Sequence, residues 1–185
     1  RLDLRYIHSE RLNDSNADEL LSGLDGIIVA PGFGQRGIEG KFTALRWARE
    51  HDVPTFGICL GMQCMVIEWA RDVLSLTDAN STEMDHTTSN NVIDLMEEQK
   101  HSERHRHRYE FNEDYRERFE ASGMRCTGIN PASGLVEVVE VPSLRWYVGT
   151  QYHPEYSSTV ESPSPLFLDF VAAAVAYRNE RAAKA

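Results

Sequence analysis

Cys59 stands between two close glycines, in the run Val-Pro-Thr-Phe-Gly-Ile-Cys-Leu-Gly-Met-Gln at residues 53–63. The run begins like a strand, and helical apolar spacing follows at 62–69, which predicts a sharp strand-to-helix turn at Cys59. Such a turn holds a nucleophile in a strained conformation, and the helix N-terminus would favour a thiolate and bind an oxyanion. The alternative is a buried cysteine in an ordinary turn.

A second candidate group lies far downstream, where a predicted strand at 146–152 ends in His153-Pro154-Glu155. Proline fixes the backbone between the two polar residues, so both side chains can be presented at one rim of a sheet. A carboxylate two residues after a histidine can hold the imidazole in one tautomer. This is what a general base beside a thiol requires. A histidine close to a glutamate is a common pair, so this pattern is weak when taken alone.

The third candidate is the glycine-rich loop Pro-Gly-Phe-Gly-Gln-Arg-Gly at residues 31–37. It follows Gly-Ile-Ile-Val-Ala at 26–30, an apolar run that suits a parallel strand buried on both faces. Loops at the carboxyl ends of such strands line the binding crevice of open α/β sheets, and glycines let backbone amides approach a ligand. A plain glycine turn is the alternative.

The remaining pattern alternates strands with helices. An alternating segment at 2–7 predicts a strand with one covered face, and the elbow strand begins at Val53. Helices are expected at 14–24, 40–51, 114–122 and 165–177, and further strands at 91–96, 109–112, 124–129 and 135–141. The alanine- and lysine-containing tail beyond Tyr177 is expected to fray. The order predicts an α/β fold with a mainly parallel central sheet in one domain, residues 1–185.

Composition restricts the functional class. A formal net charge of -10 argues against nonspecific nucleic-acid binding, and no apolar run approaches the roughly 18 residues of a membrane span. Three cysteines, an odd number without paired short spacing, indicate neither a disulfide scaffold nor a zinc motif, and favour a cytoplasmic location. The chain begins at Arg1 without a methionine, so it is expected to be part of something larger.

Residues 97–108 alternate arginine with histidine and carry several glutamates. The spacing does not match a closed zinc site, and a basic patch this short usually forms a solvated or substrate-facing edge. We therefore expect no metal here.

Together these motifs resemble the class I (triad) glutamine amidotransferases. Gly-Ile-Cys-Leu-Gly-Met-Gln around Cys59 and Gln-Tyr-His-Pro-Glu at 151–155 are similar to that family's catalytic signature. The segments at 30–37, 80–83, 92–96 and 103–110 narrow the resemblance to the C-terminal amidotransferase domains of CTP synthases. The resemblance covers nearly the whole chain and implies a flavodoxin-like three-layer fold with a cysteine nucleophile elbow.

The resemblance also implies roles for individual residues. Cys59 would attack the side-chain amide of L-glutamine, His153 would shuttle protons, and Glu155 would orient His153. The residues implied to bind glutamine, through oxyanion amides, the two ends of the substrate or the pocket wall, are Gly32, Phe33, Leu60, Gly61, Met62, Gln63, Glu83 and Arg108. Hydrolysis of the thioester would release glutamate and ammonia.

Two departures from the family pattern stand out. Residues 30–34 read Ala-Pro-Gly-Phe-Gly where many members have Pro-Gly-Gly-Phe-Gly, which is a mild change. Between Met96 and the arginine and histidine run, the family carries a long insertion with Gly-Gly-Thr-Met-Arg-Leu-Gly, whereas Lys100 here is followed at once by His101. Our hypothesis is that this loop is missing through mobility or deletion. In the family it is linked to a lid and to GTP activation.

The resemblance further implies partners. A synthetase domain that uses ATP and Mg²⁺ to aminate UTP to CTP would accept the ammonia, and this chain has no Gly-x-x-x-x-Gly-Lys-Ser/Thr loop for such nucleotides and no cofactor of its own. GTP would act at the domain interface. The whole enzyme would be a homotetramer, and this portion a monomer or weak dimer.

Three alternatives stay open at this point. One is another hydrolase on the same elbow, a peptidase or γ-glutamyl hydrolase, although Glu83 and Arg108 suit a free amino acid better. The second is a noncatalytic binding module that keeps the fold. The third is the amidotransferase of another pathway.

Overall fold

The protein is described by a computed structural model over residues 2–95 and 109–184. The central sheet has the spatial order β1 (Ile27–Val29), β2 (Thr55–Ile58), β8 (Tyr147–Thr150), β7 (Val136–Glu140) and β6 (Arg125–Ile129). A smaller sheet has the order β3 (Asn80–Ser81), β4 (Asn91–Leu95) and β5 (Tyr109–Phe111). The helices are α1 (Ala17–Leu21), α2 (Ile38–Glu50), α3 (Leu60–Asp72), α4 (Arg116–Ser122) and α5 (Pro165–Lys184). Short 3₁₀ turns cover Ser9–Arg11, Glu113–Tyr115 and Pro154–Ser157.

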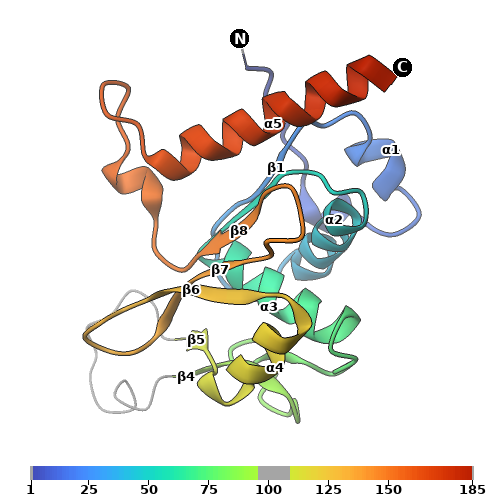
Figure 1. Ribbon diagram of the computed structural model, residues 1–185. Helices are drawn as coiled ribbons and strands as arrows, with labels where there is room; N and C mark the ends of the chain where they lie inside the picture. Colours follow the sequence, from blue (N-terminus) through green and yellow to red (C-terminus); the bar gives the residue numbers. More distant parts are fainter. Residues whose placement is uncertain (1, 96–108, 185) are drawn as a thin grey trace.

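Helices cover the two faces of the central sheet and make three layers, with α5 on one face and α2 and α3 on the other (Figure 1). The side chains of β2 show why, because successive residues of a strand point to opposite faces. Phe56 packs against Phe170 of α5 with ring centroids 6.2 Å apart, whereas a Cβ at Gly57 would lie 2.5 Å from the sulfur of Met65 in α3. The predicted α/β architecture is confirmed.

The register of the central sheet places three loops side by side. β1, β2 and β8 run parallel, with Val29 opposite Gly57 and Gly57 opposite Gly149. Because the carboxyl ends of parallel strands meet at one edge, the residues that follow these strands lie next to one another. β7 is antiparallel to β8, and β6 is antiparallel to β7, so the sheet is mixed beyond β8.

Three expectations for the secondary structure were wrong. Residues 2–7 form no strand. Leu2, Leu4 and Tyr6 are exposed, Tyr6 at 89%, and only Ile7 of this segment's apolar side chains is packed against the core. β1 is not buried on both faces, because it lies at the edge of the sheet and leaves Ile28 46% exposed. The tail beyond Tyr177 continues α5 to Lys184. Hydrogen bonds from Arg145 to Glu180 and from Arg181 to Asp25 hold this last part.

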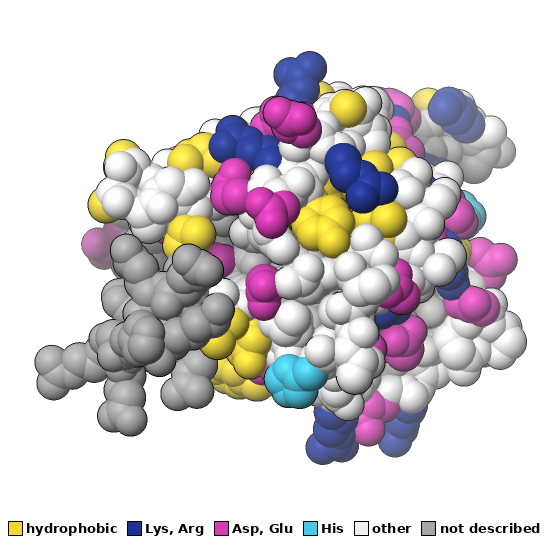
Figure 2. Space-filling model, turned by 90° about the horizontal axis from the view of Figure 1, so that it is seen from below, with side chains coloured by type: hydrophobic (Ala, Val, Ile, Leu, Met, Phe, Trp, Pro, Cys, Tyr) yellow, Lys and Arg dark blue, Asp and Glu magenta, His cyan; other side chains and the backbone are white. Residues whose placement is uncertain are grey.

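Helix α1 is shorter than the predicted span 14–24, because Asn13 and Asn16 bond to the local backbone before it starts. Within the described ranges, no helix is both long and apolar enough to cross a membrane. Figure 2 shows acidic side chains spread over the face seen from below, with lysine and arginine in small separate groups, in line with the net charge of -10.

Candidate active site

Cys59 forms the turn between β2 and α3 and has φ 55° and ψ -109°, a strained conformation for a residue with a side chain. Two glycines allow this turn. A Cβ at Gly57 would lie 2.8 Å from the backbone of Gly61, and a Cβ at Gly61 would lie 2.1 Å from the carbonyl oxygen of Val29. The turn is therefore a nucleophile elbow, as predicted, in which strand, turn and helix pack backbone to backbone.

The Cys59 side chain is 4% exposed, and burial is the largest influence on its pKa, which is raised. A hydrogen bond from the backbone N–H of Leu60 and the charge of Lys41 act in the opposite direction, whereas Glu110 and Glu155 raise the pKa further. The N–H at the start of α3 favours the thiolate, as expected, but desolvation outweighs it, so the net shift of the pKa favours the thiol. A buried thiol of this kind needs a base.

His153 and Glu155 are the candidate base. Nδ1 of His153 lies 2.5 Å from Oε1 of Glu155, and the ring stacks on Tyr156 with centroids 5.1 Å apart. Because the carboxylate accepts the Nδ1 proton, Nε2 is the nitrogen that can take a proton from a thiol. Both residues follow β8, the strand beside β2, and the charge of Glu155 acts on Cys59.

The glycine-rich loop lies against the elbow. A Cβ at Gly32 would lie 3.3 Å from the Leu60 side chain and 3.7 Å from Nζ of Lys41, and Lys41 itself donates to the carbonyl of Ala30 at 2.7 Å. Phe33, the next residue, is 82% exposed. The loop thus borders the elbow with its backbone and presents an aromatic ring to solvent.

Glu83 lies in the turn after β3, half-buried, and the same turn contacts the glycine-rich loop. The side-chain amide of Gln35 donates to the carbonyl of Met84. Glu83 is therefore held in a segment that is bonded to the loop around Gly32, although the two are far apart in sequence. Arg108, the expected partner for the glutamine carboxylate, lies outside the described residues.

The two residues after Leu60, Gly61 and Met62, both pack inside the protein. Gly61 is the close-packing glycine of the elbow. Met62 is fully buried, and a Cβ at Gly149 would lie 3.0 Å from its side chain, so the sheet covers it. Its side chain therefore belongs to the core rather than to an open pocket wall.

Gln63 is buried and forms a bridge. Its side-chain amide donates to the carbonyl of Tyr109 at 2.9 Å and to Oε1 of Gln151 at 3.2 Å. Nε2 of Gln151 lies 4.0 Å from Sγ of Cys59. The two glutamines therefore connect the nucleophile to the start of β5.

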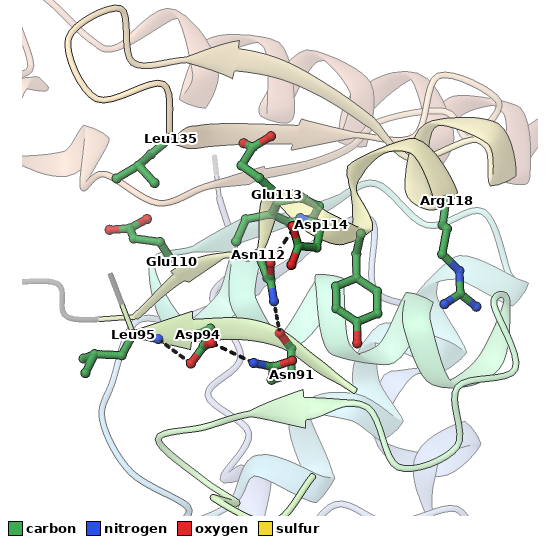
Figure 3. A pocket seen from close by; sticks show the side chains of 11 residues that line it. Asn91, Asp94, Leu95, Glu110, Asn112, Glu113, Asp114, Arg118 and Leu135 are labelled. Atoms are coloured by element: carbon green, nitrogen blue, oxygen red, sulfur yellow. Dashed lines mark hydrogen bonds between the residues drawn. The ribbon is translucent and has the colours of Figure 1, made fainter. Parts of the chain in front are cut away.

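A pocket of about 610 Å³ lies beside this site, along β4, β5 and α4 (Figure 3). None of its lining residues belongs to the candidate catalytic group, so we do not assign it to the substrate. Glu110 lines it and is 7% exposed, and Oε2 has no hydrogen-bond partner among the described residues. Burial and the charge of Glu137 raise the pKa of Glu110 to about 8.

Sequence reasoning missed Gln151, Lys41 and Glu110 as neighbours of the nucleophile. For Gln151 a signal existed, because it precedes His153 by two residues in the same motif and directly follows β8, the strand beside β2. Lys41 and Glu110 gave no such signal. They reach Cys59 electrostatically through packing of α2 and β5, which no short motif records.

Comparison with known proteins gives consistent results. The model of the glutamine amidotransferase class-I family matches residues 5–173. The CTP synthase of Bacteroides fragilis is 53% identical over 95% of this chain and 39% of its own length, and that of Porphyromonas gingivalis is 50% identical over 97% and 39%. This chain therefore spans about two fifths of the length of these curated relatives.

A solved structure matches over a larger share of its length. The glutaminase domain of Trypanosoma brucei CTPS with bound acivicin superimposes with a TM-score of 0.86 at 39% identity, covering 95% of this chain and 81% of that one. The chain therefore belongs to the class-I glutamine amidotransferases and, within them, to the glutaminase domains of CTP synthases.

Proposed function

We propose that this chain hydrolyses L-glutamine to glutamate and ammonia through a thioester on Cys59. The observation that carries the proposal is the strained elbow cysteine on β2, set beside a histidine and glutamate pair that follows the neighbouring strand β8. The similarity to a CTPS glutaminase domain supports the same chemistry.

Each step follows from the geometry. Nε2 of His153 takes the proton of the Cys59 thiol, and the sulfur attacks the side-chain carbonyl carbon of glutamine. His153 then gives the proton to the leaving nitrogen, the C–N bond breaks, and ammonia departs. Water attacks the thioester with His153 again acting as base, which releases glutamate and restores the thiol.

Glutamine would be held by groups on three segments. The N–H groups of Leu60 and Gly32 are proposed to bind the oxyanion, because α3 starts at Leu60 and Gly32 lies against it. Glu83 would bind the amino group, and Arg108 the carboxylate. Phe33, exposed beside the elbow, would cover the site once substrate is bound.

The ammonia would serve a synthetase domain that aminates UTP to CTP with ATP and Mg²⁺, within a cytoplasmic homotetramer activated by GTP. This part of the proposal rests on the resemblance to CTP synthases, the name that the relatives carry. Within residues 2–95 and 109–184, no group of three histidine, cysteine or carboxylate side chains could hold a metal ion. We derive no step through a metal ion.

The chain lacks residues that its relatives carry inside the matched span. Its alignment with the B. fragilis protein runs over 207 positions, although the chain has 185 residues. This supports the hypothesis that the family loop after Lys100 is deleted here. We therefore expect a weaker GTP response than in relatives that carry the loop.

The test is release of glutamate from glutamine by the purified chain, with and without GTP. Cys59→Ala should abolish release, because it removes the thiol at the turn after β2, beside the strand that leads to His153 and Glu155. Cys64→Ala is the matched control, since Cys64 is also buried, one turn further along α3. Equal release by the wild type and Cys59→Ala would overturn the proposal.

A further inference from the structure

Gln151 occupies a position fixed by strand pairing. β2 and β8 are parallel with Ile58 opposite Thr150, and Cys59 and Gln151 are the residues that directly follow these two strands. Cys59 itself is bonded to β8, its N–H donating to the carbonyl of Thr150 at 2.7 Å. Gln151 is 3% exposed and therefore has almost no freedom to turn away.

The hydrogen bonds of Gln63 decide which end of the Gln151 amide faces the sulfur. The Gln63 amino group has two hydrogens and two acceptors, the carbonyl of Tyr109 and Oε1 of Gln151. Turning the Gln63 amide over would place its oxygen against both acceptors. Oε1 of Gln151 is thus committed to Gln63, and its amino group points to Sγ of Cys59, 4.0 Å away.

We propose that Gln151 is a catalytic residue that donates a hydrogen bond to the Cys59 sulfur as negative charge develops there, and that Gln63 is the positioning residue that holds it. The distance of 4.0 Å is at the outer limit for a bond to sulfur, and such bonds shorten when the acceptor becomes charged or the substrate binds. The donor offsets part of the desolvation that disfavours the thiolate.

The bridge also extends beyond the nucleophile. The carbonyl that anchors Gln63 belongs to Tyr109, the first residue of β5. Any displacement of that strand end would release Gln63, then Gln151, and would weaken the donor at the sulfur. The reactivity of Cys59 is thereby coupled to the position of β5. This inference deepens the proposed function but rests on geometry that exists without substrate.

The test measures the rate of Cys59 alkylation by iodoacetamide against pH in the full chain, with the modified cysteine identified by peptide mass spectrometry. Cys64 and Cys126 interfere little, because burial raises the pKa of each to about 12. Gln151→Leu keeps the volume and removes the donor. We expect alkylation at pH 7 to slow about threefold to tenfold, which corresponds to a pKa rise of half to one unit.

Gln63→Leu should shift the profile in the same direction by less, and the double variant should be no slower than Gln151→Leu alone, because both act through one contact. Gln151→Asn, which keeps the amide but shortens the side chain, serves if Gln151→Leu fails to fold. Thr55→Val is the matched control. Thr55 is fully buried on β2, the strand that leads to Cys59, and its hydroxyl donates to the nearby carbonyl of Val53. Removing this hydroxyl should leave the profile unchanged.

A wild-type alkylation profile in folded Gln151→Leu or Gln151→Asn would overturn the proposal, and so would fully additive effects of the Gln63 and Gln151 changes. The outcome is independent of the proposed function. If the chain releases no glutamate, the alkylation profile still reports whether Gln151 acts on the sulfur.

Discussion

The two ends of helix α3 are built differently. At its N-terminal end, Cys59 lies in a strained turn, and the side-chain amide of Gln151 points to its sulfur. Toward its C-terminal end, buried Glu68 accepts hydrogen bonds from Arg49 at 2.7 and 3.0 Å, and Trp69 donates to Ser122 at 2.8 Å. The strained turn at the N-terminal end destabilises the fold, whereas the hydrogen bonds near the C-terminal end hold the helix against its neighbours.

Two buried carboxyl groups make the contrast clear. Glu68 is 2% exposed and has an arginine partner, whereas Glu110, near Cys59, is 7% exposed with Oε2 unpartnered among the described residues. Replacing residues at the catalytic end should therefore lower activity and spare stability. Replacing residues at the far end should do the reverse.

The largest effect expected is on catalysis. His153→Asn removes the base that takes the Cys59 proton, and we expect kcat for glutamate release to fall by about 10²- to 10⁴-fold. The free energy of unfolding in urea should stay nearly unchanged, because His153 lies at the rim after β8. His51→Asn, a change at the histidine that follows α2 and stacks on Trp47, is the control for activity. Loss of stability without loss of kcat would contradict the contrast.

At the far end of α3, Glu68→Ala should lower the free energy of unfolding by about 2 to 3 kcal/mol, since it removes the closest partner of the half-buried Arg49 and leaves Asp72, 3.6 Å away, as the remaining partner. The catalytic rate of the folded variant should match the wild type. Urea unfolding and glutamate release measure the two quantities.

Glu120→Ala is the matched control. It breaks the exposed pair with Arg116 and should lower the free energy of unfolding by no more than about 0.5 kcal/mol. Equal effects of the two changes would show that burial does not matter here.

Glu110 should make stability depend on pH. Its pKa is about 8 in the folded chain and near 4.5 in the unfolded chain, so the folded state binds the proton more tightly. Stability should therefore fall as pH rises from about 4.5 to 8. Burial also raises the pKa of Glu68 to about 7, so Glu110→Gln should remove the Glu110 part of that fall and gain on the order of 2 kcal/mol at high pH. Urea unfolding across this range measures the pH dependence of the free energy of unfolding.

Glu113→Gln, at an exposed position, is the control. If Glu110→Gln shows the same pH dependence of stability as the wild type, this account of the Glu110 carboxyl is wrong.

The smallest effect concerns the strained turn itself. Glycine adopts positive φ without penalty, so Cys59→Gly should be more stable than Cys59→Ala by about 1 kcal/mol. Cys64 lies inside α3, where glycine is unfavourable, and Cys64→Gly should be less stable than Cys64→Ala by a similar amount. Opposite signs at the two positions are the expected result of urea titrations. The same sign at both would mean that the elbow is not strained.

The sequence predicted the parts of the molecule that depend on local pattern. Alternating and helical apolar spacing located β2, α3 and β8, and the spacing of glycines around Cys59 indicated the elbow. Residues 2–7 showed the limit of this approach, because alternation indicates a strand only where a partner strand is present. The raised pKa of Cys59 and the amide bridge through Gln63 could not be predicted, since both depend on burial and on register between distant strands.

Covalent labelling tests the central claim most directly. The chain would be incubated with a diazo-ketone analogue of glutamine, and the labelled residue would be located by peptide mass spectrometry. We predict one label per chain, on Cys59, that excess glutamine prevents and that Cys59→Ala eliminates. A label on Cys64 or Cys126, or no label on a folded chain, would contradict the assignment of Cys59 as the nucleophile of a glutamine site.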